Sequence, residues 1–302
     1  MLKMKNSNFY IYVFLVFAMF FWGASFIFTS IVLETLDPIS IVFIRILISA
    51  VLLWAIVAIF FRKEKIPSSL FKWIAVLALF QPFVYFIAET YGLQRVSPVV
   101  TSLIISTIPV FTAIIMRMFF KAKLTTINFV GIFISLSGVV LMIIGKNMQL
   151  NVDFLGIILL FIAVFAAVGF GILLNKLSTN VHPVWLIAVQ NTIAVIYFLP
   201  LFLALRASPN FDHATVLSFL TPQWEMWVCI LILSIFCSSL AFIFFTVAVG
   251  KIGVARSAVF SNLTPIFTAI TSFFILGEQL ATSKITGIII VIFGLILTQR
   301  KK

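Results

Sequence analysis

The stretches LIISTIPVFTAI (residues 103–114) and VFSNLTPIFTAI (residues 259–270) align without a gap when the chain is displaced by 156 residues. Pro109 then falls on Pro265, and the tetrapeptide Phe-Thr-Ala-Ile begins two residues after the proline in both stretches. Both are apolar apart from a few hydroxyl and amide side chains. The match predicts an internal repeat.

The same displacement continues downstream, where it places Gly131 on Gly287 and Gly138 on Gly294. Two apolar helices can resemble each other by chance. A chance match, however, does not keep a proline and two glycines in register over so long a stretch. The repeat is therefore expected to be structural.

A second and weaker displacement, of 145 residues, relates the earlier segments and places Arg45 on Gln190. This second match depends mostly on the positions of the segments in the chain and less on identical residues. Together the two displacements predict two halves, residues 1–148 and residues 149–302.

The composition excludes a soluble protein. Hydrophobic residues make up 63% of the 302 residues and charged residues only 9%, whereas a soluble domain has about a quarter charged residues. The mean hydropathy is +1.27. So much apolar side-chain surface cannot be hidden from water in a chain of this length, which predicts a helical membrane protein.

Ten apolar runs have the length of about 20 residues that crosses a hydrocarbon core of roughly 30 Å. The predicted spans are 9–31, 39–61, 71–94, 98–120, 125–145, 153–174, 183–205, 224–249, 254–276 and 281–299. Five spans per half is an odd number, so the second half enters the membrane upside down. The predicted fold is an all-α membrane protein with ten transmembrane helices in two inverted five-helix repeats, which is typical of secondary transporters.

The distribution of charge predicts the orientation, because cytoplasmic loops carry an excess of Lys and Arg. The side of the two termini carries Lys3, Lys5, Arg62, Lys63, Lys65, Lys72, Arg117, Lys121, Lys123, Lys176, Lys251, Arg256, Arg300, Lys301 and Lys302, and the other side only Arg95, Lys146, Arg206 and Lys284. Most acidic residues show the reverse distribution. Both termini are therefore predicted to be cytoplasmic, in a bacterial inner (plasma) membrane.

The net charge of +12 lies in short loop clusters, which argues against nucleic-acid binding. No GxxxxGK[ST] loop for ATP phosphates and no metal-ligand spacing of His or Cys occurs. We therefore expect no cofactor and no metal, with a small-molecule substrate and the lipid bilayer as partners. Cys229 and Cys237 lie on one helix, too far apart for a disulfide, and are expected to be free thiols.

Four segments point to a known family: FWGASFI (21–27), DPISIVFIRILIS (37–49), YGLQRVSPVVTSLIISTIPVFTAI (91–114) and AVGKIGVARSAVFSNLTPIFTAITSFFILGEQL (248–280). They resemble the EamA family of the drug/metabolite transporter superfamily, and the resemblance covers the whole chain. It implies ten helices in an inverted repeat and the export of small metabolites or drugs from the cytoplasm. One departure is Lys121-Ala122, where the family often has a second pair like Gly277-Glu278.

Two charged residues fall inside predicted spans. Arg45 lies about 9 Å and Glu89 about 8 Å from the outer ends of their spans, at about 1.5 Å per residue. Charges within a membrane are costly and mark a functional site by default. We predict that the two side chains approach each other, directly or through water. The alternative is a structural ion pair that only orients the helices.

Gln81, Tyr85 and Glu89 recur every four residues and therefore share one helix face. A helix that carries an amide, a phenol and a carboxylate on one face should turn that face away from lipid. The alternative is ordinary hydrogen bonding between helices.

Further candidates for substrate binding or proton coupling are polar or aromatic side chains inside spans: Trp22, Ser106, Gln190, Asn191 and Asn262. Trp22 is included mainly because of the family resemblance. The predicted hinges are Pro82, Pro109 and Pro265, since a proline removes a backbone hydrogen bond from its helix. Close packing of small residues remains the alternative for the serine and asparagine positions.

The function that the sequence favours is a secondary transporter that exports small polar metabolites such as amino acids, or drugs, by alternating access. Arg45 would pair with a substrate carboxylate, and Glu89 would hold an ammonium group or carry a proton. The alternatives are a membrane-embedded enzyme acting on lipid-linked substrates and a structural membrane subunit. The enzyme is disfavoured because no His lies in a span and no second acid accompanies Glu89.

Overall fold

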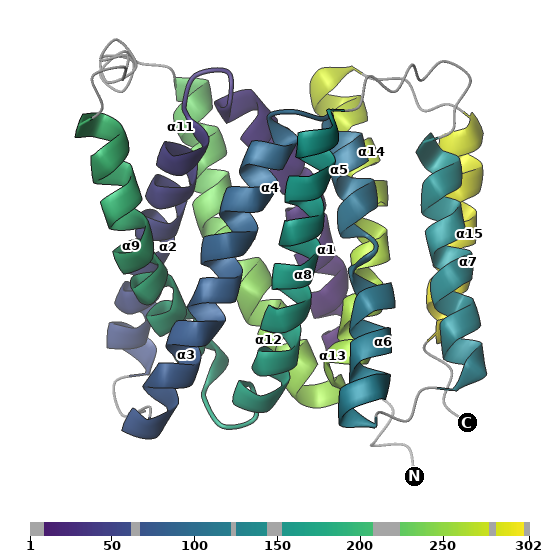
Figure 1. Cartoon of the computed structure of the whole chain (residues 1–302), viewed down its shortest axis with the longest axis horizontal. Helices are drawn as coiled ribbons and strands as arrows, with labels where there is room; N and C mark the ends of the chain where they lie inside the picture. Colours follow the sequence, from purple (N-terminus) through teal and green to yellow (C-terminus); the bar gives the residue numbers. More distant parts are fainter. Residues whose placement is uncertain are drawn as a thin grey trace.

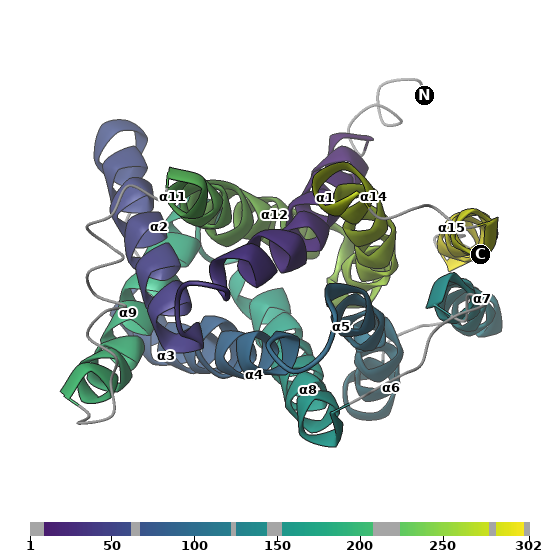
Figure 2. The ribbon, with the colours of Figure 1, turned by 90° about the horizontal axis from the view of Figure 1, so that it is seen from above.

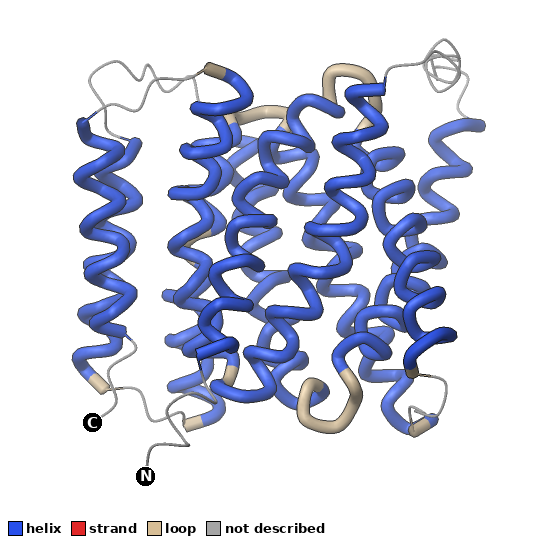
Figure 3. The backbone as a smooth tube through the Cα atoms, turned by 180° about the vertical axis from the view of Figure 1, so that it is seen from behind, coloured by secondary structure: helices blue, strands red, loops and turns tan. Residues whose placement is uncertain are grey.

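The computed structural model describes residues 9–61, 67–121, 125–143, 153–207, 224–277 and 282–298. Every regular element in these residues is helical (Figure 3). The helices stand side by side in one bundle (Figure 1).

The first half forms five helical rods. They are α1 (Phe9–Val32), α2 (Pro38–Phe60), the broken rod of η1 (Ser68–Leu70), α3 (Phe71–Ala78), η2 (Leu79–Val84) and α4 (Tyr85–Leu93), the broken rod of α5 (Pro98–Ile105) and α6 (Ile108–Phe120), and α7 (Thr126–Ile143).

The second half repeats this order. Its rods are α8 (Phe154–Leu177), α9 (Pro183–Ala207), the broken rod of α11 (Trp224–Ile232), η3 (Leu233–Leu240) and α12 (Ala241–Ile252), the broken rod of α13 (Val254–Ala258), η4 (Val259–Leu263) and α14 (Thr264–Leu276), and α15 (Thr282–Thr298).

The prediction of ten helices is confirmed. Eight rods of the described chain are long and apolar enough to cross a membrane, and α7 and α15 are the two shorter apolar helices. Each predicted span ends within three residues of the observed rod. The agreement is close because residues that favour the start of a helix stand at the ends of several rods. Asp37 accepts a hydrogen bond from the backbone N–H of Ser40 at the start of α2, and Pro38 follows it in the first turn.

The inverted repeat is visible where α7 and α15 lie side by side at one edge of the bundle (Figure 2). A methyl group added at Gly138 would lie 2.8 Å from the carbonyl oxygen of Gly287, and one added at Gly294 would lie 2.7 Å from the carbonyl oxygen of Gly131. The displacement of 156 residues exchanges these two contacts with each other. The later residue of α7 pairs with the earlier residue of α15 and the reverse, so the two helices are antiparallel and a two-fold rotation that inverts one half relates the halves. The prediction of an inverted repeat is confirmed.

The halves interlock across the bundle. α2 packs on α9, α4 packs on α8, and α1 packs on both α12 and α14. Gly23 permits the last of these contacts, since a methyl group there would lie 2.7 Å from the carbonyl oxygen of Thr264. The two halves are therefore packed directly against each other along several helix pairs.

Helix irregularities occur at matching places in the two halves. The third rod of each half contains a π-helical segment, η2 or η3, and the repeat displacement superposes them. Within η2, Gln81 is extended, with φ −148° and ψ 126°. The fourth rod of each half is broken just before Pro109 or Pro265, each of which lies in the first turn of the next helix.

Candidate functional site

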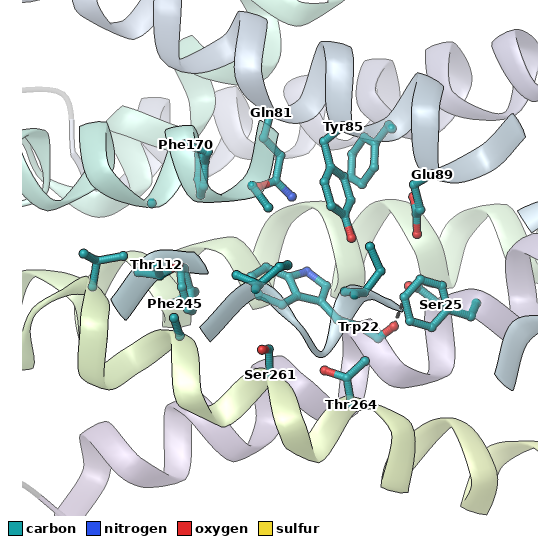
Figure 4. Close-up of a pocket in the computed structure, with 18 of the residues that line it drawn as sticks. Trp22, Ser25, Gln81, Tyr85, Glu89, Thr112, Phe170, Phe245, Ser261 and Thr264 are labelled. Atoms are coloured by element: carbon teal, nitrogen blue, oxygen red, sulfur yellow. Dashed lines mark hydrogen bonds between the residues drawn. The ribbon is translucent and has the colours of Figure 1, made fainter. Parts of the chain in front are cut away.

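A cavity of about 60 Å³ lies between the halves. In that space a few water molecules, or the polar end of a small ligand, can be held. Figure 4 shows Gln81, Tyr85 and Glu89 projecting from one side of it toward Trp22 and Ser25, with Ser261 and Thr264 on the far side of the tryptophan.

Five of the nine predicted binding or coupling residues line this cavity: Trp22, Arg45, Gln81, Tyr85 and Glu89. The shared face predicted from the four-residue spacing of Gln81, Tyr85 and Glu89 does turn inward, although η2 interrupts the helix between the first two. The four-residue spacing of a regular α-helix does not continue through η2, so that spacing alone does not place Gln81 on the face of Tyr85 and Glu89. Packing of η2 and α4 against α8 holds the face toward the cavity.

Arg45 lies on α2 with only 1% of its surface exposed. Its Nε donates to the hydroxyl of Ser238 at 3.0 Å, and its guanidinium carbon lies 3.9 Å from the centre of the Phe86 ring. Its Nη1 is buried without a hydrogen-bond partner. One side of the guanidinium is therefore held by the protein, while a donor remains for a ligand or water in the cavity.

Glu89 lies on α4 with 3% of its surface exposed, and its Oε2 is buried without a hydrogen-bond partner. The repeat places Phe245 of α12 at the equivalent position of the second half, and Phe245 also lines the cavity. The cavity consequently has a carboxylate on one side and a phenyl ring at the related position on the other.

Arg45 and Glu89 line the same cavity but form no ion pair within 4 Å, since the only salt bridge among the described residues joins Arg95 to Asp153. The direct contact allowed by the prediction is therefore not made in this conformation, and contact through water stays a prediction. Arg45 stacks on Phe86 and bonds to Ser238 instead, which directs its guanidinium toward η3.

Trp22 is held in place by its indole nitrogen, which donates to the carbonyl of Cys237 at 3.1 Å. Its ring contacts Phe242 and Phe245, each with ring centres 5.2 Å apart. An aromatic wall from both halves thus faces the charged side chains. Cys229 and Cys237 are free, as predicted.

Gln190 and Asn191 do not line the cavity but lie behind its wall on α9. Gln190 donates to the carbonyl oxygen of Gln81 at 3.0 Å, and Asn191 donates to the hydroxyl of Ser49 and to the carbonyl oxygen of Ser238. These two neighbours therefore hold η2 and η3, where the helical hydrogen-bond pattern is irregular. Their contacts with the protein position the cavity wall.

Ser106 and Asn262 also lie outside the lining. The Ser106 hydroxyl donates to the carbonyl of Leu103 within its own helix, which satisfies it locally. Asn262 is fully buried, and both polar atoms of its side chain lack a hydrogen-bond partner. Its neighbour Ser261, about a third of a turn away in the 3₁₀ segment η4, lines the cavity instead.

Several lining residues are not among the nine predicted site residues: Ser25, Thr112, Phe170, Ser261 and Thr264. The hydroxyl oxygens of Thr112 and Ser261 are buried without a partner, like the two charged groups. Ser25 lies three residues after Trp22 in the segment FWGASFI, and Thr112 and Ser261 lie in the two repeated stretches, so the sequence indicates the spans that carry them. It does not indicate that their side chains point into the cavity.

Two EamA-like transporter family matches cover residues 9–144 and 154–300. This chain belongs to the EamA-like transporter family. It is 28% identical to an uncharacterized transporter of Archaeoglobus fulgidus over 94% of this chain and 95% of the relative. It is 25% identical to the uncharacterized transporter YetK of Bacillus subtilis over 96% of this chain and 87% of the relative.

A solved crystal structure has the same fold as this EamA-like protein, with a TM-score of 0.71 over 93% of this chain and 97% of its own. Its identity of 12% carries no information on substrate. The family membership confirms a membrane transporter with two EamA domains, and its members are transporters rather than enzymes.

Proposed function

We propose that this protein is a secondary transporter for small zwitterionic metabolites, with amino acids as the first candidates, working by alternating access. The observation that supports this most directly is the pair of unpartnered polar atoms, Arg45 Nη1 and Glu89 Oε2, in one cavity between the halves. Export of such metabolites, or of drugs, follows the family resemblance.

The separation of these two charges favours a zwitterion. A buried charge is expensive unless it is paired and hydrogen-bonded, so two buried charges that do not pair with each other require other partners. A ligand with a carboxylate and an ammonium group supplies one partner to each. Water supplies them when the ligand is absent, and Tyr85, Thr112 and Ser261 offer further hydroxyls along the wall.

The orientation completes the proposal. The excess of basic residues at the end where α1 begins and α15 ends supports cytoplasmic termini. The membrane that we propose is a bacterial plasma membrane. A cavity walled by both inverted halves is the arrangement in which rocking of the halves exposes a site to each side in turn.

The experiment is transport by purified protein in lipid vesicles. Amino acids are first screened for their ability to raise the thermal unfolding temperature, and the best ligand is then followed in the vesicles with a radioactive label. Glu89→Gln keeps the shape of the side chain but removes its charge, so we expect transport of a zwitterion to fall at least tenfold. The matched control is Glu225→Gln, which removes an acid in the first turn of α11, away from the cavity.

Equal transport rates and equal pH dependence for the Glu89→Gln variant and the natural protein would refute the assigned role of Glu89. Loss in both the Glu89 and the Glu225 variants would point to a general effect of charge. An amine without a carboxylate, and a carboxylic acid without an amine, should each bind more weakly than the zwitterion.

A further inference from the structure

At one end of the bundle, two lysines from different helices approach the same tryptophan. Trp73 lies near the start of α3 and is 39% exposed. Lys72 Nζ lies 5.6 Å from the centre of its ring, and Lys176 Nζ, from the last turn of α8, lies 5.0 Å from it. The two ammonium groups are therefore separated by at most about 11 Å, the sum of these distances.

Close packing of α8 on the rod of α3 and η2 brings the two lysines together. Deeper in the bundle, a methyl group at Gly169 would lie 2.8 Å from the ring of Phe80. Gly169 and Phe80 stand two helical turns from Lys176 and Lys72 respectively, at about 3.6 residues per turn. A tight interhelical contact thus holds together the two helices that carry the lysines.

The charge at this end is strongly one-sided. Its cations among the described residues are Lys72, Arg117, Lys121, Lys176, Lys251 and Arg256. The described carboxylates outside the cavity are Glu34, Asp37, Asp153 and Glu225, and all four lie at the opposite end. Within the described part of the chain, no carboxylate of this end is therefore available to Lys72 and Lys176.

The surface that continues from Trp73 into the membrane is apolar. Val76 of α3 and Leu79 at the start of η2 follow at intervals of three residues on the same rod, and both are exposed. A tryptophan at the end of a span is typical of the membrane interface, where its ring lies at the level of the lipid headgroups. Cations at that level face lipid phosphates, and the side chains below them face acyl chains.

We propose that Lys72, Trp73 and Lys176 form a binding site for an anionic phospholipid, with its phosphate between the two ammonium groups and an acyl chain along Val76 and Leu79. The cation–π contact of a lysine with an indole is weak at an exposed site and leaves the ammonium group free to bind an anion as well. Two lysines at one ring repel each other, and an anion between them removes that repulsion.

The test uses the full-length protein in nanodiscs of phosphatidylcholine, to which phosphatidylglycerol is added as the anionic probe. Bound lipids are counted by native mass spectrometry. Each basic residue near an anionic lipid contributes about 1 kcal/mol, so losing two should weaken phosphatidylglycerol binding about thirtyfold. The variant is Lys72→Gln with Lys176→Gln. The matched control is Lys121→Gln with Lys251→Gln, which removes two exposed lysines from the same end.

The proposal requires that the Lys72/Lys176 variant loses its preference for phosphatidylglycerol while the control retains it. Replacement of both residues by arginine should preserve the preference, which separates charge from any effect on folding. Equal loss in variant and control would mean a diffuse surface effect and would overturn the proposal. Saturation of the same site by inorganic phosphate, with phosphatidylglycerol no better, would assign it to a free anion and overturn the lipid assignment.

Discussion

Arg45 is anchored to the protein by part of its guanidinium group and presents another part to the cavity. Its Nε and the face of its guanidinium are used by Ser238 and Phe86, while Nη1 remains available at the cavity. Because part of the guanidinium group already contacts the protein, its orientation is held before a ligand binds, which reduces the entropy lost on binding. The planar shape of arginine makes this possible, and lysine has no equivalent.

We therefore predict that Arg45→Lys keeps the charge but loses both anchoring contacts. The unfolding free energy should fall by about 1–3 kcal/mol, because the Ser238 hydroxyl loses its donor and the ring loses its stacked partner. Binding of a carboxylate ligand should weaken as well. Thermal unfolding with and without ligand measures both effects.

The control for this substitution is Arg95→Lys, at an exposed ion pair, where little change is expected. Full stability and full ligand binding in the Arg45→Lys variant would show that a mobile point charge suffices.

Among the elements, α9 has the most unexpected role. Gln190 and Asn191 are consecutive, yet they hold the irregular segments of two different rods, one from each half. The repeat makes this understandable, because Arg45 of α2 is the counterpart of Gln190 and bonds to η3 as Gln190 bonds to η2. Each second helix thus holds the π-helical segment of the other half's third rod.

The start of α8 offers a measurable case of helix capping. Asp153 accepts hydrogen bonds from the backbone N–H groups of Leu155 and Gly156, and it pairs with Arg95 at 2.9 Å. The hydrogen bond from Arg95, and then that from Gly156, lower the pKa of the Asp153 carboxyl below its ordinary value. The ionised form is therefore the one that stabilises the folded protein.

For Asp153 we predict a stabilisation that is present above the ordinary carboxyl pKa of about 3.9 and is lost as the pH falls through the lowered pKa. Asp153→Asn keeps a capping oxygen but removes the charge. The natural protein should unfold at a higher temperature than this variant near neutral pH, and the two should converge in acid. Thermal unfolding at a series of pH values measures the difference. A constant difference between them at all pH values would contradict the assignment.

At the scale of the whole molecule, the contact of α7 with α15 follows the two-fold relation of the halves, because equivalent residues of the two helices make equivalent contacts. Gly138 and Gly294 are repeat counterparts, and both lie where a side chain would meet backbone of the opposite helix. The central bond, from the Ser135 hydroxyl to the Val291 carbonyl, also joins residues 156 apart. The same contact surface is used twice, in opposite directions.

Gly138→Leu and Gly294→Leu should each lower the unfolding free energy by about 1–3 kcal/mol, because backbone rather than a flexible side chain occupies the space. The double variant should lose less than the sum, since one leucine already separates the helices. Chemical denaturation in detergent measures these values. Ser137→Leu, at an exposed neighbouring position, is the control. Additive losses would indicate that the two glycines lie at independent contacts.

The sequence by itself determined the membrane-spanning class, the ten rods and the inverted repeat. Each depends on patterns along the chain, namely apolar runs of spanning length and a proline and glycines in register. It also indicated Arg45 and Glu89, because a charge in an apolar span stands out without any knowledge of its neighbours.

Only the tertiary structure decided what those residues face. Gln190 and Glu89 both lie in spans as polar side chains, yet one bonds to backbone behind the wall and the other lines the cavity. The π and 3₁₀ segments rotate the faces of their rods. Within one of them, Ser261 lines the cavity and its neighbour Asn262 does not. Those rotations, and the stacking that keeps Arg45 apart from Glu89, arise from packing between residues far apart in the chain, which periodicity along a single helix does not encode.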